Sequence, residues 1–194
     1  MSETSPTVSA DGLQQLAEQI RSRRTINMFE ERPVSRDLIM EAIEVARWAP
    51  NHRLTEPWRF YVLGDEAIKK SVEMTRIVVT ERKGEELGNF KAKAAATRPG
   101  WLLVTCQRSD DELRQQEDYA SVACAIQNLM LFLSEAGVGT KWATGPIIRD
   151  SRYYEALGID ESVEFIAGVV WYGYPKVVPE QRRREVAEIA IELD

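Results

Sequence analysis

Histidine and cysteine are almost absent from this chain of 194 residues. It contains one histidine, His52, and two cysteines, Cys106 and Cys124. A single histidine excludes a metal site with several histidine ligands, and two distant cysteines indicate neither a disulfide framework nor a zinc site. Few cysteines are typical of proteins in a reducing compartment, so we expect a cytoplasmic protein.

Long apolar runs and an excess of positive charge are also missing. No apolar run approaches the roughly 18 residues of a membrane-spanning helix. The first residues, MSETSPTVSADG, lack the basic and apolar regions of a signal peptide. The formal net charge is -6, whereas nucleic-acid binding needs a basic face. We therefore expect neither a membrane nor a nucleic acid as a partner.

Several short catalytic motifs are absent as well. The sequence contains no G-x-G-x-x-G after a strand, no G-x-x-x-x-G-K-[ST], no H-E-x-x-H and no G-x-S-x-G. No nucleophile stands at a spacing from a base that indicates a catalytic pair. If the chain is an enzyme, a bound cofactor is expected to carry out the chemistry.

Hydrophobic periodicity predicts one domain over residues 11–194, preceded by a disordered tail over residues 1–10. The expected helices cover residues 11–22, 35–49, 65–82, 85–97, 111–136 and 150–158, with a short helix-like segment at 185–193. The expected strands cover residues 58–64, 101–108, 140–145 and 163–175. Helices far exceed strands, which indicates an α+β or α/β fold with a small sheet. We expect the α+β class, with a small mixed sheet surrounded by helices.

The dominant expected element is a long central helix between Asp111 and Gly139. Asp111 suits the N-cap, and Gly137 helps to end the helix. From Tyr119 to Leu133 the residues are apolar on nearly every side, and such a helix is buried all round, by its own domain or by a partner chain. A small sheet offers too little surface to cover it, which favours a homodimer. An ordinary core helix is the plainer alternative.

A cluster of arginines follows the first expected helix. Arg21, Arg23 and Arg24 precede Thr25 within five residues. The helix dipole favours cations at a C-terminus, so a charged helix end is one explanation. Arginines next to a hydroxyl group also bind phosphate. Taken alone, these residues slightly favour the helix end, and a lone loop histidine such as His52 is likewise more often a surface residue.

Several segments, in the same order, resemble the signature of the nitroreductase family. The first is RSRRTINMF at residues 21–29, followed over residues 33–64 by a run that ends in ARWAPNHRLTEPWRFYVLG. The second half matches in EDYASVACAIQNLMLFLSEAGVGTKWATG at residues 117–145, and in GYP at residues 173–175 before another arginine cluster. The resemblance spans residues 18–190 and looks most like the short branch of NAD(P)H nitroreductases.

The resemblance implies a nitroreductase-like fold with a long dimerisation helix and FMN bound between two subunits. The first arginine cluster would hold the phosphate and ribityl side, the A-P-N-H loop would reach the partner's flavin, and the G-T-K-W-A-T-G stretch would line the isoalloxazine ring. By position, the implied cofactor-binding residues are Arg23, Arg24, Thr25, Asn27, Trp48, His52, Trp142, Ala143 and Thr144, with one of Arg182 and Arg184. The resemblance thus makes phosphate binding the favoured interpretation of the cluster.

One position departs from the family pattern. Many members carry Lys or Arg two residues after the hydroxyl, where the cation approaches the flavin and stabilises negative charge on reduction. This chain has the neutral residue Asn27 there. A hydrogen bond to the flavin remains open to Asn27, but a charge does not, so the flavin potential and the substrate range are not fixed by the resemblance.

The implied function is NAD(P)H-driven reduction of a nitroaromatic or quinone-like acceptor on FMN, by a ping-pong mechanism without a side-chain acid or base. Flavin or enone reduction and dehydrogenation are alternatives on the same scaffold. A non-catalytic flavin-binding protein would use the same pocket without turnover, and a helical interaction module would be colourless. Bound flavin and steady NAD(P)H oxidation distinguish these possibilities.

Overall fold

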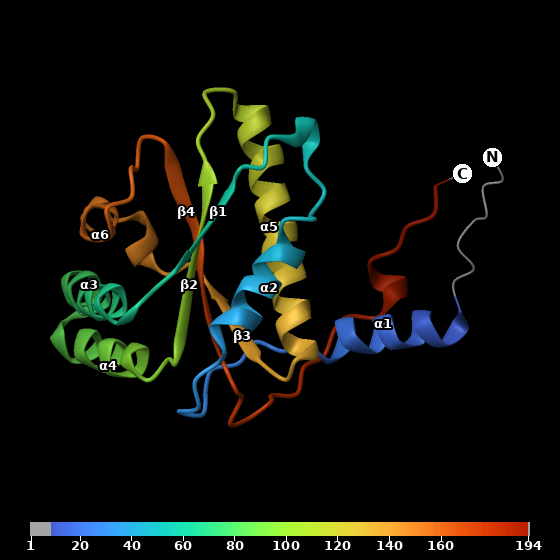
Figure 1. Cartoon of the computed structure of the whole chain (residues 1–194), viewed down its shortest axis with the longest axis horizontal. Helices are drawn as coiled ribbons and strands as arrows, with labels where there is room; N and C mark the ends of the chain where they lie inside the picture. Colours follow the sequence, from blue (N-terminus) through green and yellow to red (C-terminus); the bar gives the residue numbers. More distant parts are fainter. Residues whose placement is uncertain (1–8, 194) are drawn as a thin grey trace.

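The chain folds around a four-stranded sheet with helices on both faces (Figure 1). The computed structural model describes residues 9–193. The strand order is β1-β2-β4-β3, and every ladder is antiparallel. The strands are β1 (Trp58–Val62), β2 (Gly100–Gln107), β3 (Gly139–Ala143) and β4 (Glu164–Gly173). The predicted α+β class is confirmed, but the sheet is antiparallel rather than mixed; the one parallel pairing among the described residues is an isolated bridge between Thr25 and Thr140.

The helices lie close to their predicted positions. They are α1 (Ala10–Ser22), α2 (Arg36–Ala46), α3 (Asp65–Lys83), α4 (Glu85–Ala96), α5 (Glu112–Glu135) and α6 (Ser151–Leu157), with 3-10 turns η1 (His52–Leu54), η2 (Pro146–Arg149) and η3 (Val186–Glu188). The predicted tail falls mostly on residues 1–8, outside the described part. Its last two residues form the start of α1, because Ala10 is the first residue of that helix and Ser9 Oγ caps it by accepting from Gly12 N at 3.1 Å.

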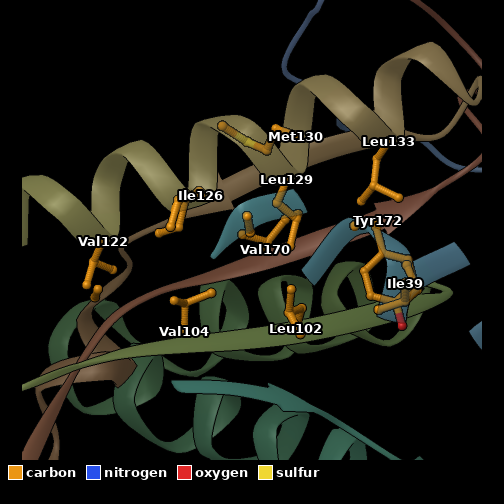
Figure 2. Close-up of a cluster of buried hydrophobic side chains, with 14 of the residues drawn as sticks. Ile39, Leu102, Val104, Val122, Ile126, Leu129, Met130, Leu133, Val170 and Tyr172 are labelled. Atoms are coloured by element: carbon orange, nitrogen blue, oxygen red, sulfur yellow. The ribbon is translucent and has the colours of Figure 1, made fainter. Parts of the chain in front are cut away.

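The long helix α5 and helix α2 cover one face of the sheet. Asp111 caps α5 by accepting from Leu113 N at 2.9 Å and Arg114 N at 3.2 Å. Figure 2 shows the resulting core, in which side chains of α5 point onto β2 and β4. Its labelled members are Ile39, Leu102, Val104, Val122, Ile126, Leu129, Met130, Leu133, Val170 and Tyr172. Each fully buried aliphatic side chain stabilises the fold by about 1.5–3 kcal/mol.

A second core joins the other face of the sheet to α3, α4 and α6. Successive side chains of a strand point to opposite faces, so Leu102 and Val104 of β2 meet α5 while Trp101 and Leu103 enter the second core. For this reason β2 is buried on both faces. Strand β3 forms one edge of the sheet, and two of its residues, Lys141 and Ala143, line the candidate site.

Two segments project from the body on the same side (Figure 1). Helix α1 has no buried residue, and its apolar residues Leu13, Leu16 and Ile20 are about half exposed. The chain after β4 is exposed from residue 177 to 193. The prediction of a helix over residues 185–193 is wrong, because only the turn η3 forms there. A short segment that packs against nothing does not hold a helix in water.

Helix α5 also keeps one uncovered stripe within the single chain. Leu113, Ala120 and Cys124 are exposed, and Gln127 and Leu131 are partly exposed. Their spacing of three, four or seven residues places them on one face. The expectation that this helix is buried on every side is therefore not met by its own chain.

Glu164 at the start of β4 is a buried carboxylate that ties three strands together. It accepts from Arg59 Nη1 at 2.9 Å, from Tyr61 OH at 2.6 Å and from the Thr105 hydroxyl. We expect Glu164→Ala to lower the free energy of unfolding by about 2–4 kcal/mol, because two hydroxyl groups lose their acceptor. Urea unfolding at fixed protein concentration measures this loss. Arg59→Ala is the control, since the Arg59 side chain is largely exposed, and equal losses in the two variants would contradict the interpretation.

Candidate functional site

A cavity of about 310 Å³ opens between the α3–α4 pair and the β3–η2 region. Its apolar wall includes Val169 and Trp171 of β4 and Ile147 and Ile148 of η2. All the charged residues that line the cavity are cationic, although the whole chain carries a net charge of -6. These cations are Arg82, Lys83, Lys91, Arg98 and Lys141. A cavity with an apolar wall and only cationic charges suits a flat, negatively charged ligand.

The arginine segment after α1 runs beside this cavity. Thr25 pairs with Thr140 of β3 in the isolated bridge, and Ile26 N donates to Thr140 O at 2.9 Å. In the same segment, Asn27 Oδ1 accepts from Lys141 Nζ of β3 at 2.7 Å. Lys141 lines the cavity, so the segment meets the edge of the cavity at Asn27. A ligand could therefore contact the segment and the cavity together.

The two predicted phosphate-binding arginines have different environments. The Nε of Arg23 is buried without a hydrogen-bond partner. Burial lowers the pKa of Arg23, and the charges of Arg183 and Arg24 lower it further. Arg24 instead donates from Nη1 to the carbonyl of Arg21 and, at 3.0 Å, to that of Arg23. Arg24 thus closes the end of α1, whereas Arg23 remains available for an anion.

The C-terminal arginine whose charge reaches Arg23 is Arg183, a member of the arginine run that was not among the predicted phosphate ligands. All three arginines of this run are exposed, but of the three only Arg183 is near enough for its charge to lower the pKa of Arg23. Neighbouring side chains in an extended segment point in different directions, so only part of a run of three arginines can face one site. The run itself was the sequence signal, and the choice within it depended on the backbone.

The predicted ring-lining residues divide between the two faces of the sheet. Ala143 lines the cavity together with Lys141, two residues before it. Trp142, between them, faces the core beneath α5, where its Nε1 donates to Ala167 O at 3.3 Å. Thr144 lines a separate, more open cleft beside Phe165. The side chains of Trp142 and Thr144 thus lie outside the cavity that Ala143 lines, because strand alternation sends Trp142 to the opposite face, and contact of residues 142–144 with the flavin ring stays a prediction.

The loop between α2 and β1 displays Trp48 and His52 on the surface, and neither lines the cavity of its own chain. Trp48 is 75% exposed. Three non-glycine residues of the loop, Arg53, Leu54 and Glu56, have φ values of 59°, 52° and 43°. Such conformations cost about 1–3 kcal/mol each and often occur at functional sites.

Hydrogen bonds hold this loop in its strained shape. Asn51 Nδ2 donates to Thr55 Oγ1 at 2.9 Å, and Thr55 Oγ1 donates to the buried Asp118 of α5 at 2.6 Å. Asn51 Oδ1 also accepts from Glu56 N at 2.7 Å. Leu54 is left 82% exposed. These hydrogen bonds hold the loop in a shape in which Leu54 points to solvent. No local sequence signal indicated that Leu54 would be exposed.

The described residues offer little for other chemistry. Burial and, to a lesser extent, the charge of Asp118 raise the pKa of the Cys106 thiol to about 12, so the thiol is protonated and unreactive at neutral pH. No group of three His, Cys, Asp or Glu side chains in the described part could hold a metal ion. Within residues 9–193, no helix has the length and apolar character needed to cross a membrane.

The site fits the FMN that the resemblance implies. Two arginine Nε groups, of Arg23 and Arg98, are buried without partners, as is Trp171 Nε1. An unsatisfied buried donor costs about 1–3 kcal/mol, and a bound anion or carbonyl would remove that cost for those it reaches. The apolar wall suits an aromatic ring, and the buried arginine suits a phosphate.

Comparison with known sequences points in the same direction. The sequence model of the nitroreductase family matches residues 20–174. YfhC of Bacillus subtilis, whose name assigns it provisionally to the NAD(P)H nitroreductases, is 36% identical over 170 residues, which are 85% of this chain and 87% of that protein. An iodotyrosine deiodinase of Thermotoga neapolitana is 28% identical over 179 residues, 86% of this chain and 92% of that protein.

Comparison with solved structures gives the same fold. A nitroreductase-like family protein from Bacillus cereus superposes with a TM-score of 0.84 at 26% identity, covering 100% of this chain and 99% of that chain. A nitroreductase-type protein from Desulfovibrio desulfuricans, solved in complex with FMN, has a TM-score of 0.75 at 23% identity, covering 92% of this chain and 96% of that chain. The nitroreductase-like fold expected from the sequence is confirmed.

Proposed function

This chain belongs to the nitroreductase family, and we propose that it is an FMN-dependent oxidoreductase that takes electrons from NADH or NADPH. One observation carries the proposal: the arginine segment pairs with strand β3 at Thr140, and its Asn27 accepts a hydrogen bond from Lys141, which lines the cationic, apolar-walled cavity. A phosphorylated aromatic cofactor needs these two surfaces next to each other. The FMN named in the Desulfovibrio desulfuricans structure agrees with that reading of the site.

Different residues of this chain would bind the phosphate, the ribityl chain and the ring of FMN. Arg23 and Arg183 would hold the phosphate, and Thr25 would contact the ribityl chain. Ala143 and the apolar wall around Trp171 would take the ring and exclude water from one side of it. When bound, FMN supplies the redox chemistry, since its ring accepts electrons from a reduced nicotinamide and passes them to an acceptor. No side chain is assigned as a catalytic acid or base.

We further propose that the active unit is a homodimer. Leu113, Ala120 and Cys124 leave an open stripe on α5, and α1 exposes its whole apolar face. Trp48 and His52 lie outside the cavity of their own chain, on a loop whose shape is fixed by hydrogen bonds. A second copy would cover the stripe and place this loop against the partner's flavin.

The proposed acceptors are nitroaromatic and quinone-like molecules, reduced in alternation with the nicotinamide. Both substrates would use the side of the ring that this chain leaves open, so one must leave before the other binds. The NAD(P)H nitroreductase name of YfhC favours this class over a binding protein without turnover. We place the protein in the cytosol, where NADH and NADPH are available and the free thiols of Cys106 and Cys124 stay reduced.

The absorbance of the purified protein in the flavin bands tests the proposal first. Titration of the apoprotein with FMN and with riboflavin, which lacks the phosphate, then measures the phosphate contribution. Turnover is measured as NADH and NADPH oxidation with a nitroaromatic, a quinone and 3-iodotyrosine in parallel. A protein that binds no FMN refutes the proposal, and FMN binding without oxidation of either nicotinamide indicates a storage or sensing protein.

His52→Ala is expected to leave the protein folded and dimeric but to lower FMN affinity or turnover severalfold. The loss should be partial, because the cofactor rather than the imidazole carries the redox chemistry. FMN titration and NAD(P)H oxidation of the variant measure it. Arg53→Ala, in the same exposed loop, serves as the comparison. Unchanged affinity and unchanged rate in His52→Ala would make His52 a surface residue.

A further inference from the structure

Lys141 places a positive charge beside Asn27, where this chain lacks the cation that many family members carry. Asn27 is neutral, whereas many family members carry a cation at that place in the arginine segment. In the folded chain the side chain of Asn27 holds a cation from another element, because Lys141 Nζ of β3 donates to Asn27 Oδ1 at 2.7 Å. The ammonium group therefore lies beside Asn27, on a side chain that lines the cavity.

A second cation, Arg98, also binds Asn27. Arg98 Nη1 donates to the backbone carbonyl of Asn27 at 2.5 Å. The Arg98 guanidinium carbon lies 4.9 Å from the centre of the Trp171 ring, and Lys141 Nζ lies 5.5 Å from it. Asn27 and Trp171 thus hold the two positive groups against the apolar wall of the cavity.

Neither cation has a counter-ion in the described part of the chain. No carboxylate there lies within ion-pair distance of Lys141 or Arg98. Burial lowers the pKa of Lys141, and the charges of Arg98 and Lys91 lower it further. Burial also lowers the pKa of Arg98. Hydrogen bonds to an amide and a carbonyl, and contact with one ring, do not neutralise two full charges.

A structural role for Lys141 explains less of this arrangement. A residue needed only to fasten Asn27 could be neutral, since a neutral donor would also bond to Oδ1. It would also avoid repulsion from Arg98 and Lys91. The arrangement is favourable when negative charge enters the cavity, because partly buried charges interact more strongly than exposed ones.

We propose that Lys141, held by Asn27 and backed by Arg98, supplies the positive charge that stabilises the reduced flavin ring in this chain. The inference rests on the proposed function. Two electrons and one proton pass from the nicotinamide to the neutral ring, which leaves the nicotinamide oxidised and the ring with one negative charge. A cation fixed beside the ring favours that product and so raises the midpoint potential of bound FMN. Lys141 is here a tuning residue for the cofactor and not a proton donor.

The midpoint potential of bound FMN, measured by equilibration with redox dyes, tests the inference without reference to turnover. Lys141→Met keeps the length of the side chain and removes its charge. We expect it to disfavour the reduced form at least tenfold, which lowers a two-electron potential by about 30 mV. Lys141→Arg should stay closer to the wild type. Lys93→Met, at an exposed position of α4 outside the cavity lining, should not shift the potential.

A rescue variant separates charge from structure. Asn27→Lys combined with Lys141→Met returns a cation to the arginine segment and should restore most of the lost potential. Should Lys141→Met alone fold poorly or lose FMN, the double variant and Lys141→Arg carry the test. A wild-type potential in Lys141→Met with FMN bound, or an FMN-loaded double variant without recovery, overturns the inference while leaving the proposed function intact. Absence of FMN binding in the wild type would instead refute the proposed function, and the inference with it.

Discussion

Arg23→Ala is expected to weaken FMN binding by about ten- to a hundredfold, whereas Arg24→Ala should change it far less. Arg23 has a buried Nε without a partner, and its pKa is lowered by burial and by Arg183. A hydrogen bond to a charged group is worth about 1.5–3 kcal/mol, and every 1.4 kcal/mol is about tenfold in affinity. Arg24 is already engaged by backbone carbonyls at the end of α1.

The measurement is titration of each apoprotein with FMN and with riboflavin. Because Arg23 would act on the phosphate, Arg23→Ala should lose affinity for FMN and keep its affinity for riboflavin. Arg183→Ala should act in the same direction, and Arg182→Ala, one residue earlier and exposed, is its control. Equal FMN affinity in wild type and Arg23→Ala would return the arginine cluster to the simpler explanation of a charged helix end.

Ala120→Arg is expected to break the proposed homodimer and, with it, most of the stability of the fold. Ala120 lies in the open stripe of α5 between Leu113 and Leu131. In a symmetric dimer the substitution occurs twice in one interface. Burial of an uncompensated charge costs about 3–5 kcal/mol, so the dissociation constant should rise at least about a hundredfold. The wild-type chain, by contrast, should not persist as a folded monomer at micromolar concentration.

Sedimentation velocity and thermal unfolding at several concentrations test this prediction. Ala96→Arg is the matched control, because Ala96 is an exposed alanine on α4, on the other face of the sheet from α5 (Figure 1). It should leave both mass and stability unchanged. A wild-type chain that sediments as a stable folded monomer, or an Ala120→Arg variant that remains a dimer of normal stability, would show that the stripe is an ordinary surface.

Most helices and strands could be predicted from the sequence, because their signals are local. Asp111 and Gly137 lie at the two ends of α5, and the alternation of apolar residues in β2 places Trp101 and Leu102 on opposite faces. The prediction of a helix at residues 185–193 was wrong because a local signal alone does not stabilise a short helix. Apolar periodicity indicates which face would be buried, but a helix so short forms only where something covers that face.

The candidate site was predictable only in part. The arginine segment was found from its composition and the family resemblance, and in the structure its Asn27 contacts Lys141, which lines the cavity. The cavity itself was not foreseen, because its walls come from β3, β4, η2 and the α3–α4 pair, which are far apart along the chain. Lys141 was passed over next to Trp142, since the sequence does not state which of two neighbouring strand residues faces a ligand.

The sequence by itself determined the fold class and the family, through ordered motifs and hydrophobic periods that depend on residues close together in the chain. It also determined that Asn27 carries no charge. Only the tertiary structure decided which charges act at the site. Strand pairing brings Lys141 to Asn27, the path of the C-terminal segment brings Arg183 towards Arg23, and burial alters both pKa values. Charge interactions depend on distance and burial, and neither quantity exists until residues remote in sequence are packed together.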